Sequence, residues 1–161
     1  MVSQNKERPI RGLIPPAITP FTSDGGIDPA AIRALADFWA PRVDALFICG
    51  TYGSGPMSTP EQRCRAAELY LEAIAGRIPV IVHVGAASTY TAVHLARHAQ
   101  SQGAQAVAAV PPFYYEHSES SIVDYYKRIR DAVDITFYAY NNPKCEAPFG
   151  KIVHVPKIEQ K

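Results

Sequence analysis

Hydrophobic positions along the chain follow two alternating patterns. Short apolar runs that end in Gly, Pro or Asn alternate with longer stretches in which apolar residues recur at helical spacing. The last four short runs are almost continuously apolar, which is typical of parallel strands buried on both faces. The first run contains prolines, which a strand tolerates near its ends or at a sheet edge. The short runs predict β-strands at residues 12–21, 45–50, 79–85, 106–110 and 135–140.

The longer stretches predict helices with recognisable start signals. Asp28 followed by Pro29 is typical of an N-cap with proline at the first helical position. Thr59-Pro60-Glu61-Gln62 has the residues of a capping box, in which the Thr and Gln side chains each bond a backbone N–H. The predicted helices begin at residues 29, 60, 88 or 89, and 118, and the second and third run to about residues 75 and 102.

Strands that alternate with helices indicate an α/β fold with a parallel sheet. Two architectures fit this order: an open doubly wound sheet, or part of a (β/α)8 TIM barrel. A nucleotide-binding doubly wound sheet usually carries a Gly-rich turn after its first strand, but residues 19–26 contain no GxGxxG, and the chain contains no GxxxxGK[ST]. The pattern favours the barrel. We expect one domain, 1–161, holding about the first five strands and four helices.

Composition excludes several classes of function. The formal charge of +1 argues against a nucleic-acid partner, and no apolar run is long enough to span a membrane. Residues 1–11 form a polar arm of mixed charge without the apolar core of a signal peptide. Three cysteines without metal-type spacing favour a cytoplasmic protein. His94 and His98 lack the Glu of a zinc motif, so we expect no metal and no cofactor.

Hydroxyl groups recur where the predicted strands end. Active groups of a barrel lie at the carboxyl ends of its strands. Thr51 and Tyr52 follow one strand, Tyr114 and Tyr115 follow another, and Tyr140 closes the last. Glycines flank Thr51, so backbone N–H groups there could approach an anion such as a carboxylate closely.

These segments together resemble the dihydrodipicolinate synthase/N-acetylneuraminate lyase family of pyruvate-dependent class I aldolases. GLIPPAITPF at 12–21 resembles the first strand of the family, and GTYGSG at 50–55 its G-[ST]-T-G-E loop. VPPFYY at 110–115 resembles V-x-P-[YF]-Y, and YNNP at 140–143 resembles Y-N-x-P. Their order and spacing also fit, and the resemblance covers roughly residues 12–143.

The resemblance implies a role for each of these residues in a lyase. Tyr140 would relay a proton during Schiff-base formation and hydrogen-bond the bound pyruvyl group. Thr51 would link Tyr140 to Tyr114, which in such families reaches in from a neighbouring subunit, so a homo-oligomer is implied. Thr51 and Tyr52 would hold the carboxylate of pyruvate or a similar keto acid. A hydroxyl chain suits this role because a phenol of pKa near 10 is a poor base at neutral pH.

The chain departs from the family pattern at three places. Ser54 stands where the loop usually has Glu, and Cys145 stands where dihydrodipicolinate synthases have an Arg, which argues against a role in lysine biosynthesis. The Schiff-base lysine of the family lies at the end of strand six, and that strand end would fall beyond Lys161. Residues 144–161 form an atypical tail whose lysines follow no convincing sixth strand. We therefore expect a C-terminally truncated member that is inactive alone.

Two other readings remain open from the sequence. The first is a non-catalytic half-barrel that binds a keto acid or self-associates through its exposed strand edges. The second is a small doubly wound binding domain unrelated to aldolases. Helices on both faces of the sheet would support the doubly wound domain, whereas helices on one face only would exclude it. Tyr140 could also be a strand-end phenol that donates to a backbone carbonyl.

Overall fold

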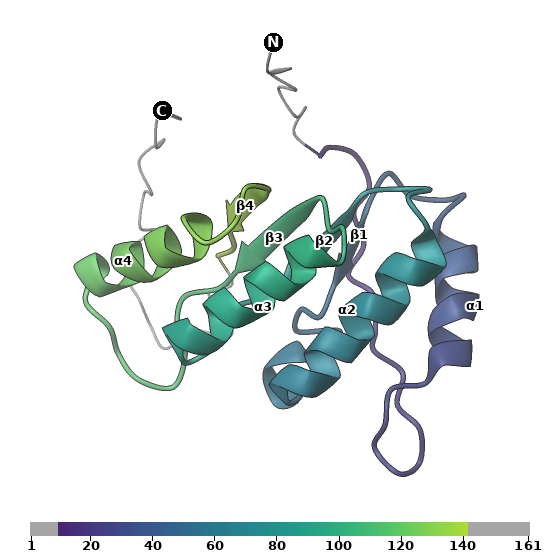
Figure 1. Cartoon of the computed structure of the whole chain (residues 1–161), viewed down its shortest axis with the longest axis horizontal. Helices are drawn as coiled ribbons and strands as arrows, with labels where there is room; N and C mark the ends of the chain where they lie inside the picture. The colour runs from purple at the N-terminus through teal and green to yellow at the C-terminus, as the bar shows by residue number, and fades with distance from the viewer. Residues whose placement is uncertain (1–9, 142–161) are drawn as a thin grey trace.

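A computed structural model describes residues 10–141, which form one α/β unit (Figure 1). The tail predicted at 144–161, and all but the last two residues of the arm predicted at 1–11, lie outside the described residues. The elements in chain order are α1 (Pro29–Trp39), β1 (Leu46–Ile48), the 3-10 turn η1 (Gly55–Met57), α2 (Pro60–Ile74), β2 (Val80–His83), α3 (Thr89–Ser101), β3 (Ala106–Ala109), α4 (Glu119–Arg130) and β4 (Thr136–Ala139).

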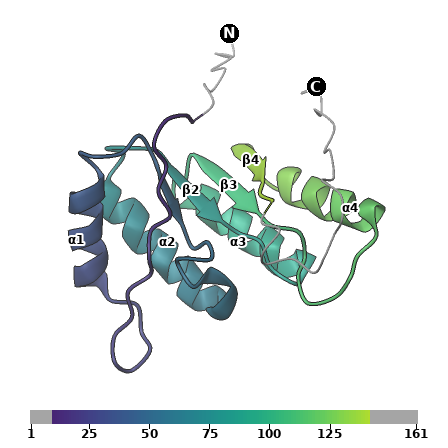
Figure 2. The same ribbon diagram turned by 180° about the vertical axis from the view of Figure 1, so that it is seen from behind.

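The four strands form one parallel sheet in the order in which they occur in the chain. Leu46 pairs with Val80, and Val107 pairs with Phe137. A doubly wound sheet reverses its strand order at a switch point, and the described strands show no such reversal. Helices α2 and α3 lie in front of the sheet in Figure 1 and behind it in Figure 2. One-sided helices and sequential strands are the arrangement of a barrel wall, so the doubly wound reading is excluded.

The segment predicted as the first strand, residues 12–21, is extended but is not a continuous strand. It contacts β1 through one parallel bridge, between Pro16 and Phe47. The N–H of Ala17 donates to the Phe47 carbonyl at 2.8 Å, and the N–H of Phe47 donates to the Pro15 carbonyl at 3.1 Å. Proline has no N–H to donate, so consecutive prolines at 15 and 16 shorten the ladder that this segment can make.

Three of the four helices begin with side-chain caps, two of them, at Asp28 and Thr59, predicted from the sequence. The Asp28 carboxylate accepts from two N–H groups of the first turn of α1. Thr59 and Gln62 form the reciprocal capping box of α2, at 3.2 and 2.9 Å. The Ser118 hydroxyl accepts from the N–H of Ser121 at the start of α4. Each cap satisfies donors that a helix start leaves without an intrahelical partner.

Side chains alternate along each strand, so the sheet has two different faces. The outer face packs against the helices and carries the main core, with Leu46, Ile48, Val80, Val82, Val107 and Ala109 among its buried residues. The inner face carries a smaller cluster around Ile81, Ala106 and Ala108, against which Ile10, Ile14, Phe47, Tyr138 and Tyr140 pack. Tyr138 and Tyr140 therefore share one face of the sheet.

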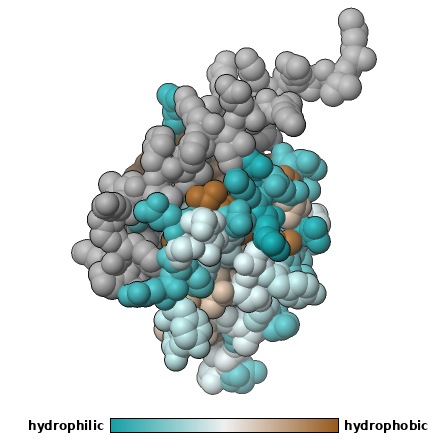
Figure 3. Space-filling model, turned by 90° about the vertical axis from the view of Figure 1, so that its left-hand side faces the viewer, coloured by the Kyte–Doolittle hydropathy of each residue, from teal (hydrophilic) through white to brown (hydrophobic). Residues whose placement is uncertain are grey.

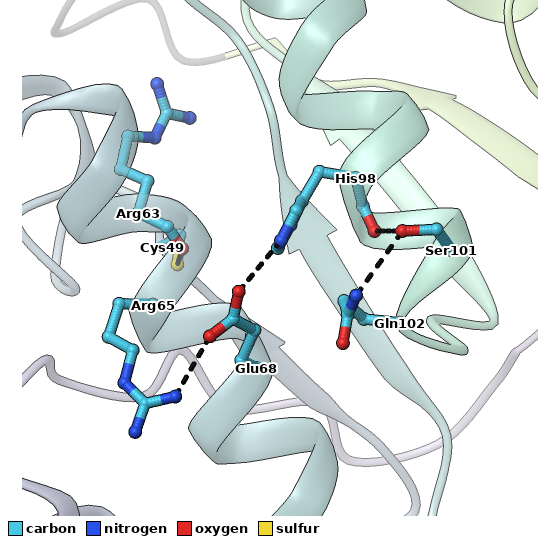
Figure 4. A network of polar contacts seen from close by, with 7 residues as sticks. All are labelled: Cys49, Arg63, Arg65, Glu68, His98, Ser101 and Gln102. Atoms are coloured by element: carbon cyan, nitrogen blue, oxygen red, sulfur yellow. Dashed lines mark hydrogen bonds and ion pairs between the residues drawn. The ribbon is translucent and has the colours of Figure 1, made fainter.

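Polar contacts join the helices on their outer side. The Glu68 carboxylate of α2 pairs with Nε2 of His98 on α3 at 3.1 Å and with Arg65 at 3.0 Å (Figure 4). The side of the molecule that carries α4 is mostly hydrophilic where its described residues show (Figure 3). Within residues 10–141, no helix is long and apolar enough to cross a membrane.

Candidate functional site

A pocket of about 370 Å³ opens on the inner face of the sheet. Thr51 and Tyr52 line it from the loop after β1, and Tyr140 lines it from the residue after β4. Its walls are mostly apolar and come from the sheet and from the segment that precedes α1; they are Ile10, Ile14, Pro16, Phe47, Ile81, Ala108, Tyr138 and Ala139. The fold thus brings together three of the four site residues predicted from the sequence.

Three aromatic rings pack edge to face beside this pocket. The centroid of Tyr140 lies 5.7 Å from that of Phe47 and 6.2 Å from that of His83. The Phe47 and His83 centroids are 6.0 Å apart. The rings come from β1, from β2 and from the end of β4, and such edge-to-face pairs are favoured by the charge distribution of the rings. The Tyr140 ring is therefore held by neighbours from two other strands.

The loop after β1 is compact and needs its glycines. The N–H of Gly55 donates to the Gly50 carbonyl at 3.0 Å, and the N–H of Ser54 donates to the Thr51 carbonyl at 3.1 Å. A Cβ on Gly55 would lie 1.8 Å from the Cys49 carbonyl oxygen, so no larger residue fits there. The loop folds against Cys49 while Thr51 and Tyr52 remain exposed, with 74% of Tyr52 accessible.

Tyr114 stands apart from the other predicted site residues. It is 85% exposed, does not line the pocket, and packs edge-on against Tyr115 with ring centroids 4.8 Å apart. Its φ of 90° lies in a region that bulky residues rarely adopt. Backbone strain of this kind clusters at functional positions.

The second phenol of the last strand has a structural partner. The hydroxyl of Tyr138 accepts a hydrogen bond from the N–H of Ile10 at 3.3 Å. This bond ties the segment that precedes α1 to β4, across the inner face. Tyr138 therefore belongs to the wall of the pocket, whereas Tyr140 lies at the carboxyl end of the strand, where barrels place their chemistry.

Two buried polar residues lie next to the site: His83, 2% exposed, and Arg63, 5% exposed. The sequence predicts that His83 is an ordinary core histidine, and it suggests no role for Arg63. Arg63 nevertheless falls on the buried stripe of α2 with Ala66, Ala67 and Tyr70. A charged residue at an apolar position of a helical repeat is the signal that would have revealed it.

Burial shifts the ionisation of this region toward neutral forms. Burial, and to a lesser extent the positive charge of Arg63, lower the pKa of His83 to about 3. Burial also raises the pKa of the Cys49 thiol to about 11 and that of the Tyr125 phenol to about 12. Imidazole, thiol and phenol are therefore all uncharged at neutral pH, and none of the three can act as an anion there.

Residues 10–141 contain no group of three His, Cys, Asp or Glu side chains placed to hold a metal ion. The histidine pair on α3, His94 and His98, comes nearest to such a motif in the sequence. Of the two, His98 pairs instead with Glu68 of the neighbouring helix.

Comparison with known proteins connects this geometry to one family. The model of the dihydrodipicolinate synthetase family matches residues 9–150. A probable 2-dehydro-3-deoxy-D-pentonate aldolase of Escherichia coli (strain K12) is 39% identical over 133 residues, which is 82% of this chain and 44% of that protein. An N-acetylneuraminate lyase of Rhizobium meliloti (strain 1021) is 33% identical over 135 residues, 83% of this chain and 45% of the lyase.

Solved structures agree with the sequence matches. YagE of Escherichia coli K12, a dihydrodipicolinic acid synthase family protein solved in complex with pyruvate, superposes with a TM-score of 0.82 at 31% identity. The match covers 86% of this chain and 47% of that one, so the chain spans about half the length of the relatives it matches. The relatives are TIM-barrel enzymes, and the described sheet and helices correspond to part of such a barrel. The chain belongs to the dihydrodipicolinate synthetase family.

Proposed function

We propose that this chain provides the keto-acid site of a Schiff-base aldolase, a lyase that adds an aldehyde to the methyl carbon of a pyruvyl group or removes it. The observation that carries the proposal is the shared pocket. Thr51, Tyr52 and Tyr140 come from two segments far apart in the sequence and line one pocket of about 370 Å³. That size suits a small keto acid, and relatives that include a protein solved with pyruvate support this ligand class.

The loop after β1 is proposed to hold the carboxylate of the keto acid. Thr51 and Tyr52 are exposed on a loop whose backbone is held by hydrogen bonds between its own residues. Hydroxyl and N–H donors on a rigid loop bind an anion without having to be ordered on binding. The mostly apolar walls of the pocket would exclude water from the other end of the ligand.

Tyr140 is proposed to relay protons to and from the pyruvyl group, with Thr51 linking it to Tyr114. In a Schiff-base aldolase the imine acts as an electron sink that makes the adjacent carbon acidic. Tyr114 does not line the pocket of its own chain and is 85% exposed. This favours a homo-oligomer in which Tyr114 completes the site of a neighbouring subunit, and we propose a cytoplasmic location for it.

A pyruvate titration tests the proposed ligand. Thr51→Val keeps the shape of the side chain but removes the hydroxyl, and loss of a hydrogen bond to a charged group weakens binding by about tenfold or more. Thr91→Val, on α3 and outside the pocket lining, is the matched control. Calorimetry that shows equal pyruvate affinity for both variants would remove Thr51 from the site.

Borohydride reduction in the presence of pyruvate tests the lyase chemistry. For the 161 residues given, we expect no trapped lysine, because none of Lys144, Lys151, Lys157 and Lys161 follows a convincing sixth strand. A version of the chain extended through a sixth strand that ends in lysine is expected to be trapped. Mass spectrometry reads out the result, and an adduct on a lysine of the 161-residue chain would overturn the expectation.

A further inference from the structure

The buried guanidinium of Arg63 joins helix α2 to the end of strand β2. Nη2 of Arg63 donates to the His83 carbonyl at 2.8 Å, and Nη1 donates to the Gly85 carbonyl at 3.0 Å. None of the ion pairs found among residues 10–141 involves Arg63. A buried charge is costly unless hydrogen bonds compensate it. In Figure 4 the Arg63 side chain points away from Arg65 and Glu68, which carry the ion pairs of the same helix.

The His83 ring lies between several parts of the candidate site. Its Nε2 accepts a long hydrogen bond, 3.4 Å, from the N–H of Val110 at the end of β3. The ring also hydrogen-bonds the carbonyl of Cys49, the residue before the 50–55 loop. Its edge-to-face contacts with Phe47 and Tyr140 complete these interactions. One side chain thus contacts the loop, the end of β3 and the proposed proton relay.

The contacts of the ring bear on which of its two nitrogens carries the proton. Neutral imidazole has one N–H and one acceptor nitrogen. The Val110 N–H points at Nε2 and the Cys49 carbonyl accepts from the ring, so we assign the proton to Nδ1, as the donor to that carbonyl. Nη2 of Arg63, which can only donate, lies 3.4 Å from Nδ1, but its closer acceptor is the His83 carbonyl at 2.8 Å. A second ring proton would place an imidazolium beside the guanidinium and would leave the Val110 N–H without its acceptor.

We propose that His83 is a positioning residue for the keto-acid site: as the Nδ1–H tautomer it fixes the 50–55 loop through the Cys49 carbonyl and the Tyr140 ring by edge contact. Arg63 has a supporting role, since it holds the backbone at the end of β2, on either side of Val84. The inference rests on the proposed function, because the site that His83 positions is the proposed keto-acid site; the contacts of His83 do not depend on that function. The pKa of His83, lowered to about 3, keeps the ring in this neutral form throughout the physiological range.

The tautomer can be measured in the unmodified protein. Long-range 1H–15N correlation spectra distinguish a protonated Nδ1 from a protonated Nε2. We expect the Nδ1–H form of His83, unchanged between about pH 5 and 8, because burial and Arg63 both disfavour the charged ring. A proton on Nε2, or titration of His83 within that range, would overturn the proposal without any variant having to fold.

Two substitutions separate the polar contacts of His83 from its ring contact. H83F keeps a ring but removes both nitrogens, so hydrogen exchange at the amides of Ser54 and Gly55 is expected to rise about tenfold. H83N keeps a donor near the position of Nδ1 but removes the ring, so loop exchange is expected to stay within about twofold while the ring signals of Tyr140 shift. Pyruvate affinity is expected to fall about tenfold in H83F.

Tyr125→Phe serves as the matched control. The Tyr125 hydroxyl accepts from the N–H of Ala86 and donates to its carbonyl, so its loss weakens the same buried region one residue beyond Gly85. The variant is expected to lose stability but to leave loop exchange and the Tyr140 signals unchanged. Equal loop exchange in H83F and Tyr125→Phe would overturn the proposal. If the unmodified protein fails to bind pyruvate, the proposed function is wrong. Hydrogen exchange of the loop amides and the tautomer of His83 would still decide whether His83 is a positioning residue.

Discussion

The two faces of the sheet come from the same strands but have different chemistry. The outer face, under the helices, presents Leu46, Ile48 and Val82, which are almost fully buried and apolar. The inner face presents Phe47, His83 and Tyr140, which are aromatic and partly polar, beside an open pocket. Neighbouring residues of one strand therefore lie in different environments, one in the apolar core and the next beside the pocket, because side chains alternate between the two faces.

The comparison indicates where stability and function reside. Close packing on the outer face removes apolar surface from water, which is the main favourable contribution to folding. The inner face leaves 370 Å³ open and fixes its polar groups through long-range contacts such as Arg63 with His83. Substitutions on the outer face should therefore mainly change the free energy of unfolding, and those on the inner face mainly ligand binding.

The largest effect is expected for a matched pair of isoleucines on adjacent strands. Ile48→Ala, on the outer face, should lower the free energy of unfolding by about 2–5 kcal/mol because it leaves a cavity in the main core. Ile81→Ala, on the inner face, should cost less because the side chain already borders the pocket. Urea denaturation measures both, and equal losses would contradict the division between the faces.

Two tyrosines on the inner face test whether that face carries ligand binding. Tyr140→Phe should change the free energy of unfolding by less than about 1 kcal/mol but weaken pyruvate binding about tenfold, since a hydrogen bond to the ligand is lost. Tyr138→Phe removes the acceptor of the Ile10 N–H and should leave pyruvate affinity within about twofold. Titration calorimetry distinguishes them, and a larger binding loss in Tyr138→Phe would reverse the assignment.

Helix α2 contributes to both faces of the sheet. Its apolar residues belong to the outer core, and its Arg63 holds the backbone carbonyl of His83, whose ring lies on the inner face. Thr59→Ala removes one half of the capping box and should cost about 1 kcal/mol of unfolding free energy. Thr59→Ser, which retains the hydroxyl, should restore most of it. Since the N–H of Arg63 donates to the Thr59 carbonyl at 3.0 Å, hydrogen exchange at Arg63 should rise in the alanine variant only.

The smallest effect is expected on the outer surface, between α2 and α3. The Glu68 pKa is held below its usual value of 4.5, first by the hydrogen bond from Arg65 and then by His98. A lowered folded-state pKa adds stability above the unfolded pKa and loses it as pH falls through the folded value. Glu68→Gln should cost about 0.5 kcal/mol at pH 7, and the difference should vanish in the acid range.

The exposed Glu72→Gln on the same helix controls for removing a surface carboxylate. Thermal or urea unfolding at two pH values, one neutral and one below the usual pKa of Glu68, measures both variants. A difference between wild type and Glu68→Gln that grows as the pH falls would contradict the expected sign.

Much of the fold follows from local patterns in the sequence. The Asp28, Thr59 and Ser118 caps start the helices at their predicted positions. The predicted strands at 45–50 and 135–140 contain the observed β1 and β4, each shortened at its ends. The first strand was the exception, because the missing N–H groups of consecutive prolines reduce it to a single bridge.

The candidate site was predicted in part. Thr51, Tyr52 and Tyr140 could be named because strand ends and Gly-rich turns are visible in a sequence, and the pocket contains all three. The role of Tyr114 stays a prediction, since its side chain is exposed on the single chain. Arg63 and the contacts of His83 were not foreseen, because each joins residues at least 20 positions apart.

The sequence by itself determined the alternation of strands and helices, the two faces of each strand and the family to which the chain belongs. The alternation and the two faces depend on neighbouring residues, whose periodicity and capping act over a few positions. The family is recognised from short motifs whose order and spacing can be followed along the chain. The tertiary structure alone decided that Phe47, His83 and Tyr140 form one ring cluster and that Arg63 faces the end of β2. The parallel pairing of β1 to β4 and the packing of α2 bring these groups together from positions far apart in the sequence, which no local pattern encodes.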